Sequence, residues 1–196
     1  MKKIKRLQLI GFVLILCGLL ALLGSFLMEK ISQTENHKAL EQMMAILPPA
    51  TPGVTDQYSD MQMPSLQLGG QDYVALLEAP LYGAKLPVRS HWNAMAAGNC
   101  PTRFFGTVYD GSLVIGGSGK EGQLDFLARI QNGDTILVTD MTGAQFAYRV
   151  TKIFRTSSAQ QEMLMDETAD LTLFAWNNMG LEYIVVRCAA DVVPTE

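Results

Sequence analysis

A run of twenty residues without a charged side chain, from Leu9 to Met28, constrains this chain more than any other feature. A helix of this length and composition can cross the hydrocarbon core of a bilayer. Four basic residues precede the run, at Lys2, Lys3, Lys5 and Arg6. Because basic residues stay on the cytoplasmic side, residues 1–6 are predicted to be cytoplasmic and residues 7–28 to form a transmembrane helix.

The chain is therefore expected to be a single-pass protein of the cell membrane, with its C-terminal domain outside the cell. The alternative is a cleaved signal peptide, which has a similar basic start and apolar centre. The length of the run favours a retained anchor, and so does the lack of an Ala-x-Ala cleavage site after it.

Residues 29–68 are predicted to form a juxtamembrane helix followed by a Pro-rich stalk. Apolar side chains recur at helical spacing behind a candidate N-cap at Ser32 or Thr34, and they are Leu40, Met43, Met44 and Leu47. A helix cannot continue through the residues that come next, Pro48, Pro49, Pro52 and Gly53. The stalk is expected to hold the chain extended before a folded domain begins.

Residues 69–196 have the pattern of an all-β domain, because short apolar or β-branched runs alternate with Gly, Asp, Asn and Pro. The predicted strands begin at Tyr73, Ser112, Thr135, Gln145, Leu171 and Tyr183. Between two of them, a short helix is predicted over residues 123–131, with Leu124, Leu127 and Ile130 on its apolar face. Short strands with one inserted helix favour a closed barrel of seven or eight strands, which leaves no exposed sheet edge.

Charge and metal-ligand patterns exclude several kinds of partner. The net charge is −4 and no basic stripe is present, which argues against a nucleic-acid partner. Cys100 and Cys188 lack the spacing of a zinc site, and His37 and His91 stand alone. The sequence therefore predicts neither a metal nor a cofactor. A disulfide between Cys100 and Cys188 is permitted outside the cell, and the sequence leaves it undecided.

Four segments follow one another along the domain: "YVALLEAPLYGAKLPV", "RFFGTVYDGSLVIGG", "LDFLARIQNGDTILVTD", and "LTLF" followed by "VVRC". In this order they resemble segments of the sortases, the membrane-anchored cysteine transpeptidases of Gram-positive bacteria. The domain from about Asp72 to Ala190 resembles this family, and its class B/D-like members above all. The resemblance implies an eight-stranded barrel. It also implies a reaction in which a Cys thiolate attacks a sorting-signal peptide, a His protonates the departing amine and an Arg stabilises the oxyanion.

All three catalytic positions that the resemblance implies hold other residues. The family His closes an Ile-x-Gly-His motif, and "IGGS" places Ser118 there. The family Cys closes Thr-Leu-x-Thr-Cys, and "TLFAW" places Trp176 there. The family Arg lies seven positions further on, where this chain has Tyr183. A shift of register does not restore the set, because no Cys lies within ten positions of Trp176 and no His follows His91.

The sequence gives little support for other residues as replacements for the missing catalytic groups. Cys188 and Cys100 have no neighbouring His to lower the thiol pKa, and a buried, unassisted thiol is inert. Ser118 has no base to activate its hydroxyl, so it is interpreted as a turn residue in "GGSGKEG". Arg187 lies four residues beyond Tyr183 and is interpreted as structural. Trp176 is expected either to plug the substrate groove or to floor it for a peptide bound by aromatic contact.

Three functions therefore remain open. The favoured one is a catalytically inactive, sortase-like binding or accessory module at the cell surface, with a peptide or surface protein in the groove near Trp176. The second is a sortase-type transpeptidase or hydrolase with a non-standard site. The third is a purely structural surface protein.

Overall fold

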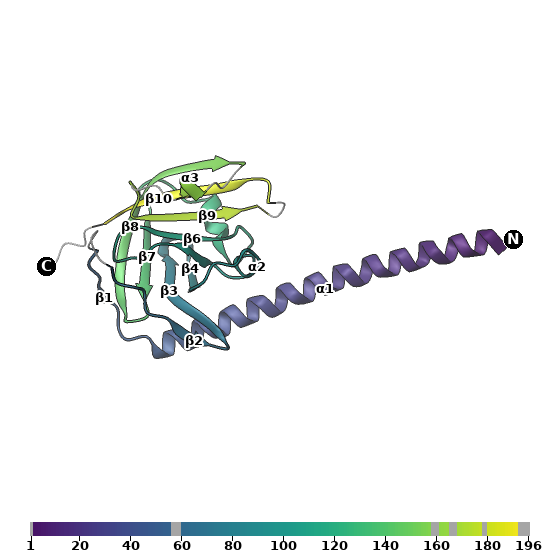
Figure 1. Cartoon of the computed structure of the whole chain (residues 1–196), viewed down its shortest axis with the longest axis horizontal. Helices are drawn as coiled ribbons and strands as arrows, with labels where there is room; N and C mark the ends of the chain where they lie inside the picture. The colour runs from purple at the N-terminus through teal and green to yellow at the C-terminus, as the bar shows by residue number, and fades with distance from the viewer. Residues whose placement is uncertain (1, 56–59, 158–160, 165–167, 178–179, 192–196) are drawn as a thin grey trace. The chain divides into compact units, whose positions relative to one another are not determined.

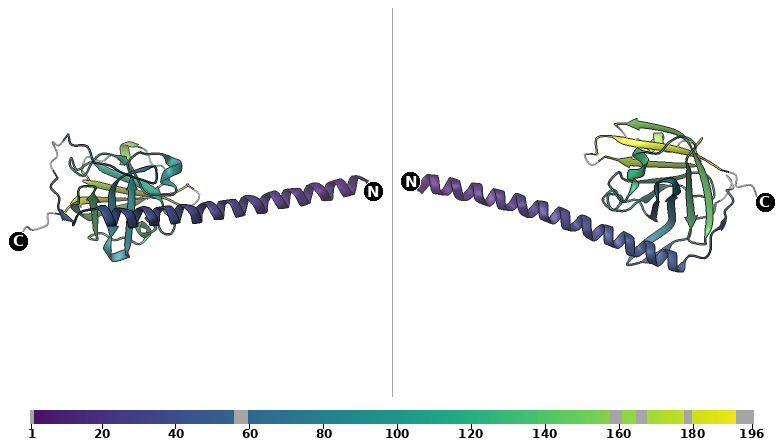
Figure 2. Two further views of the ribbon diagram at one scale, coloured as in Figure 1. Left: turned by 90° about the horizontal axis from the view of Figure 1, so that it is seen from below. Right: turned by 180° about the vertical axis from the view of Figure 1, so that it is seen from behind.

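The computed structural model describes residues 2–55, 60–157, 161–164, 168–177 and 180–191. The chain divides into two compact units, residues 1–35 and residues 36–196. The second unit contains every strand and is shown from three directions in Figures 1 and 2.

Helix α1 runs without a break over Lys2–Ile46. The expected N-cap at Ser32 or Thr34 is therefore wrong, because the helix continues through both residues. Residues 29–46 contain no Gly or Pro that could interrupt it, and the first proline is Pro48, just beyond its end. Within the part of the chain that the structure describes, no helix is both long and apolar enough to cross a membrane. The transmembrane helix at residues 7–28 stays a prediction.

The described residues form ten strands in one sheet, and eight of them close a barrel. The closed order is β8–β10–β9–β6–β5–β4–β3–β7 and back to β8, so the predicted closed barrel is confirmed with eight strands. The strands are β1 (Thr51–Pro52), β2 (Leu66–Leu68), β3 (Gln71–Ala79), β4 (Ala84–Arg89), β5 (Thr102–Phe105), β6 (Leu113–Ser118), β7 (Thr135–Asp140), β8 (Ala144–Thr156), β9 (Leu171–Trp176) and β10 (Tyr183–Ala190). The short helical segments are η1 (Pro80–Tyr82), α2 (Ala94–Ala97), η2 (Leu124–Ala128) and α3 (Gln161–Leu164).

Much of the segment predicted as a juxtamembrane helix and stalk belongs to the barrel unit. Ala39 and Met43 of α1 are buried in a cluster with Tyr73 of β3. Strand β1 pairs in parallel with β8, and Met63 is buried in the barrel core. The compact unit therefore begins near residue 36 rather than at the expected boundary, residue 69. The apolar residues of this segment find a surface to bury against, which an isolated stalk would not provide.

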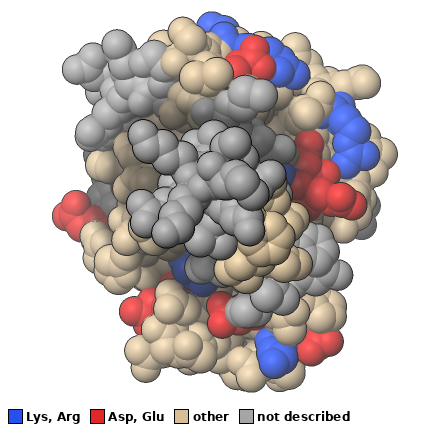
Figure 3. Space-filling model, turned by 90° about the vertical axis from the view of Figure 1, so that its right-hand side faces the viewer, with Lys and Arg blue, Asp and Glu red and all other residues tan. Residues whose placement is uncertain are grey.

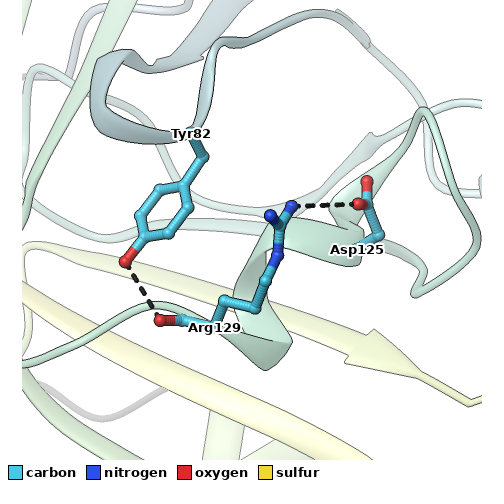
Figure 4. A network of polar contacts seen from close by, with 3 residues as sticks. All are labelled: Tyr82, Asp125 and Arg129. Carbon is cyan, nitrogen blue, oxygen red and sulfur yellow. Dashed lines mark hydrogen bonds and ion pairs between the residues drawn. The ribbon is translucent and has the colours of Figure 1, made fainter.

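The predicted helix at residues 123–131 is present as the shorter 3-10 helix η2. Its predicted apolar residues Leu124, Leu127 and Ile130 all lie in the core cluster. The end of η2 is held by a polar network (Figure 4), in which the Tyr82 hydroxyl donates to the Arg129 carbonyl at 3.0 Å. The Arg129 guanidinium contacts the Asp125 carboxylate at 3.4 Å. These contacts fix η2 against η1 on the same side of the barrel.

Asp140, at the end of β7, is fully buried, and its carboxylate accepts hydrogen bonds from four donor groups. Its Oδ1 accepts hydrogen bonds from the backbone and hydroxyl of Thr142, at 2.8 and 2.7 Å, and from the Ala144 backbone at 3.0 Å. Its Oδ2 accepts from the Tyr109 hydroxyl at 2.6 Å. One side chain thus closes the β7–β8 turn and ties it to the loop before β6.

We expect Asp140→Ala to lower the free energy of unfolding by about 3 kcal/mol or more, because several buried donors lose their acceptor together. Tyr109→Phe removes a single hydrogen bond and should cost about 1 kcal/mol. Urea denaturation of the full-length variants, followed by circular dichroism, measures both changes. Equal effects of the two substitutions would contradict the role given to Asp140.

Candidate functional site

Ser118, Trp176 and Tyr183 lie in one row across three adjacent strands. In the parallel pair β6–β9, Ser118 is the register partner of Trp176. In the antiparallel pair β10–β9, Tyr183 is the register partner of the same Trp176. Side chains that are opposite one another on paired strands project from the same face of a sheet. The fold thus brings together the three positions where the resemblance to the sortases implies catalytic residues.

The row lies on the face of these strands that points away from the barrel core. Leu173 and Ala175 of β9 belong to the core cluster, whereas Phe174 belongs to a second cluster, against which Trp176 and Tyr183 also pack. Gly116 of β6 leaves room for the Phe174 ring, because a Cβ at this position would lie 2.1 Å from the ring carbon Cζ. A glycine in β6 therefore lets an aromatic ring lie flat over the strand and form a floor.

A hollow of about 350 Å³ opens over this floor. Aromatic rings form most of its wall, and the lining residues are Trp92, Ala94, Phe104, Leu164, Phe174, Trp176, Gly180 and Tyr183. Trp92 packs edge-to-face against Phe104 at 4.9 Å and against Trp176 at 6.3 Å, between ring centroids. We call this hollow the aromatic pocket. Trp176 lines this pocket, and its indole leaves the hollow open.

No protein-family model matches the sequence, and no curated protein matches it either. Solved structures resemble the barrel. The sortase D5 transpeptidase of Clostridium perfringens is 22% identical over 61% of this chain and 79% of its own, with a TM-score of 0.52. Sortase A of Corynebacterium diphtheriae is 16% identical over 86% of this chain and 86% of its own, with a TM-score of 0.53. The domain has the sortase fold.

A third solved structure was determined with a peptide motif. Sortase C of C. perfringens with the C-terminal cell wall sorting motif is 16% identical over 63% of this chain and 72% of its own, with a TM-score of 0.54. At these identities the likeness concerns the sortase fold alone. The class B/D-like assignment and the loss of catalysis stay predictions.

Within the sortase fold, Ser118 is buried. Its side chain is only 1% exposed, and its Oγ accepts a hydrogen bond from the Lys120 backbone at 3.3 Å. The next residue, Gly119, donates its N–H to the Trp176 carbonyl at 2.9 Å. No His lines the aromatic pocket among the described residues. Ser118 is thus the last, buried residue of strand β6, and the turn predicted there begins after it.

Both thiols of the barrel unit are free and buried. Cys100 packs with Met43 and Tyr73, and its Sγ lies 3.3 Å from the Pro87 carbonyl oxygen. Cys188 lies in the barrel core, in a different cluster. The disulfide that the sequence left open is therefore not formed. Burial raises the pKa of each thiol to about 12, so neither is a thiolate near neutral pH.

Arg187 has the structural contacts expected of it. Its guanidinium lies 5.2 Å from the centroid of the Phe154 ring, and its Nη2 donates to the Met163 carbonyl at 3.0 Å. It projects from the same face of β10 as Tyr183 but sits four residues away. Strand spacing of about 3.3 Å per residue separates the two positions by about 13 Å.

On the face shown in Figure 3, basic and acidic side chains occur close together at several places. Among the described residues, no group of three or more His, Cys, Asp or Glu side chains is placed to hold a metal ion. The aromatic pocket is therefore the strongest candidate site.

Proposed function

We propose that this protein is a non-catalytic, sortase-like binding module that holds an apolar side chain of an extended peptide in the aromatic pocket. The observation that carries the proposal is the position of this pocket. Trp176 and Tyr183 line it, and they occupy two of the three positions where the sequence resemblance places the catalytic residues of a sortase. The wall is built of rings that a peptide side chain can pack against with little loss of conformational entropy.

The chemistry of the thiols supports the non-catalytic part of the proposal. A thioacyl mechanism needs a thiolate beside a proton donor. Cys100 and Cys188 are fully buried, and neither lines the aromatic pocket. Losing a complete catalytic set typically costs on the order of 10⁶ in rate, which leaves binding as the remaining activity.

The choice of a peptide ligand is supported by the structure of C. perfringens sortase C with a cell wall sorting motif, which shares the fold. We further propose that residues 7–28 anchor the module in the cell membrane with the barrel on the outer side. The charge-free run and the basic residues before it support this arrangement. The neighbourhood of the membrane would then bring exported chains to the pocket.

The test is binding of end-blocked, fluorescein-labelled Gly/Ser octapeptides with one central leucine or phenylalanine. We expect full-length protein in detergent micelles to bind such peptides without cutting them. Trp176→Ala should weaken binding about 30-fold, the loss typical of an aromatic hot spot. Fluorescence polarisation measures the affinities, and Leu81→Ala is the control, because Leu81 is 74% exposed and lies outside the pocket.

Two results would contradict the proposal. Equal affinities of the wild-type protein and Trp176→Ala would remove the pocket as the binding site. Cleavage of a sorting-signal peptide by the unaltered protein, abolished by Cys188→Ala, would favour the transpeptidase alternative.

A further inference from the structure

A second hollow, of about 410 Å³, adjoins the aromatic pocket and is lined by more polar side chains than that pocket. Trp92 and Phe104 line both hollows, so the two share part of their wall. The residues that distinguish the second hollow are Ser90, His91, Arg103 and Asp110. An elongated ligand with an apolar group on Trp92 and Phe104 can therefore extend into a polar environment without leaving the protein surface.

Arg103 of β5 is the cation of this second hollow. Its Nε donates to the Ser90 carbonyl at 3.1 Å, which holds the plane of the guanidinium. Among the described residues, that carbonyl is the only hydrogen-bond or ion-pair partner of the Arg103 side chain. The side chain is half-buried, and burial lowers the pKa of the guanidinium. A partly desolvated cation without an anion is a costly arrangement that a bound anion would relieve.

Asp110, the carboxylate in the same hollow, is already engaged elsewhere. Its Oδ1 accepts hydrogen bonds from the Ser112 hydroxyl at 2.6 Å and from the Ser112 backbone at 3.0 Å. It also accepts from the Thr107 backbone at 3.3 Å. Burial raises the pKa of Asp110, but these hydrogen bonds from Ser112 and Thr107 outweigh it and lower the pKa overall. Asp110 thus holds the 107–112 turn and makes no ion pair with Arg103.

His91 adds a second polar group beside the guanidinium. Its Nδ1 lies 2.6 Å from the Ser90 Oγ, and Ser90 is also the residue whose carbonyl holds Arg103. Ser90 therefore positions two side chains that line one hollow. A guanidinium offers parallel N–H donors whose spacing matches the two oxygens of a carboxylate.

We propose that Arg103 binds a carboxylate of the same peptide whose apolar side chain occupies the aromatic pocket. This inference rests on the function proposed above and narrows its ligand to an acidic peptide. In an extended peptide each residue advances about 3.3 Å, so an acid within one to four residues of the apolar side chain suits two hollows that share a wall. The carboxylate can come from an acidic side chain or from the C-terminus of the peptide.

The test compares three forms of the labelled octapeptide on full-length protein in detergent micelles. One form has a glutamate one to four residues from the central phenylalanine and a blocked C-terminus. The second has glutamine in its place, and the third has glutamine with a free C-terminal carboxylate. We expect the glutamate form or the free-carboxylate form to bind about tenfold tighter than the neutral form, the effect of one hydrogen-bonded charge pair. Whichever form gains affinity identifies the source of the carboxylate.

Arg103→Gln should abolish the preference for the carboxylate-bearing peptide over the neutral one. Arg103→Lys keeps the charge without the planar fork and should retain only part of the preference. Arg149→Gln is the matched control, because Arg149 is exposed and paired with Asp191 at 2.5 Å, so the preference should survive. Thermal unfolding followed by circular dichroism checks that each variant folds. If Arg103→Gln does not fold, the affinities of the three peptides for wild-type protein and for Arg103→Lys test whether Arg103 binds the carboxylate.

Each failure has a distinct meaning. Equal affinities of all three peptides for wild-type protein, with binding still dependent on Trp176, would overturn the carboxylate site and leave the proposed function intact. A preference that survives Arg103→Gln would overturn the assignment to Arg103. Binding of none of the peptides would overturn the proposed function, and the carboxylate site with it.

Discussion

A protein that carries Ser118→His, Trp176→Cys and Tyr183→Arg together is expected to cleave a sorting-signal peptide in a thiol-dependent reaction. The three positions are register partners on β6, β9 and β10, so the new imidazole, thiol and guanidinium would project from one face of neighbouring strands. Adjacent strands lie about 4.8 Å apart, which is close enough for the thiol and the imidazole to interact. Removal of the Trp176 indole also frees volume beside the buried Ser118 for the larger His.

The matched control is Trp176→Cys alone, which supplies the nucleophile without a proton donor or an oxyanion partner. The triple variant should exceed this control by about 10² to 10⁴ in rate, the usual contribution of general acid–base catalysis. Chromatography of the cleaved peptide measures the rate, and prior treatment with iodoacetamide should abolish it. A folded triple variant without activity would mean that the groove has changed beyond these three side chains.

The sequence predicts most of the barrel because its longest strands carry clear β-patterns. The strands predicted from Gln145, Leu171 and Tyr183 correspond to β8, β9 and β10. The sequence does not predict strand β4, because Pro87 interrupts its pattern. It does not predict β5 either, because four residues are too few to show a period. Residues 48–68 are predicted as a stalk because the sequence shows their prolines, whereas the surface that they pack on is formed by distant strands.

The candidate site is predictable only where a local motif marks it. Ser118, Trp176 and Tyr183 follow from motifs at strand ends, and register then brings them together. Trp92 and Phe104 carry no such signal, because both pack against Phe174, which lies 82 and 70 positions further along the chain. The local sequence does not indicate the proposed carboxylate-binding role of Arg103 either. This role depends on the Ser90 carbonyl, thirteen residues earlier, and on the burial of the side chain, and the local sequence predicts neither.

In the native protein, Cys100 and Cys188 are expected to resist alkylation. With each thiol pKa raised to about 12 by burial, only about one molecule in ten thousand carries a thiolate at pH 8. An unperturbed cysteine has a pKa of about 8.5, so iodoacetamide should react on the order of 10³-fold more slowly with the folded protein than with the denatured one. Because the thiolate is the reactive form, the rate should keep rising with pH above pH 9 instead of levelling off.

Mass spectrometry of the peptides that contain Cys100 and Cys188 measures both rates, with urea-denatured protein as the reference. Treatment of the folded protein should also leave peptide binding unchanged, since neither thiol lines the aromatic pocket. Rapid modification of either cysteine at pH 8 would contradict the buried positions described for them. If that modification also blocked binding, a thiol would have to lie in the groove, and the non-catalytic function would no longer follow.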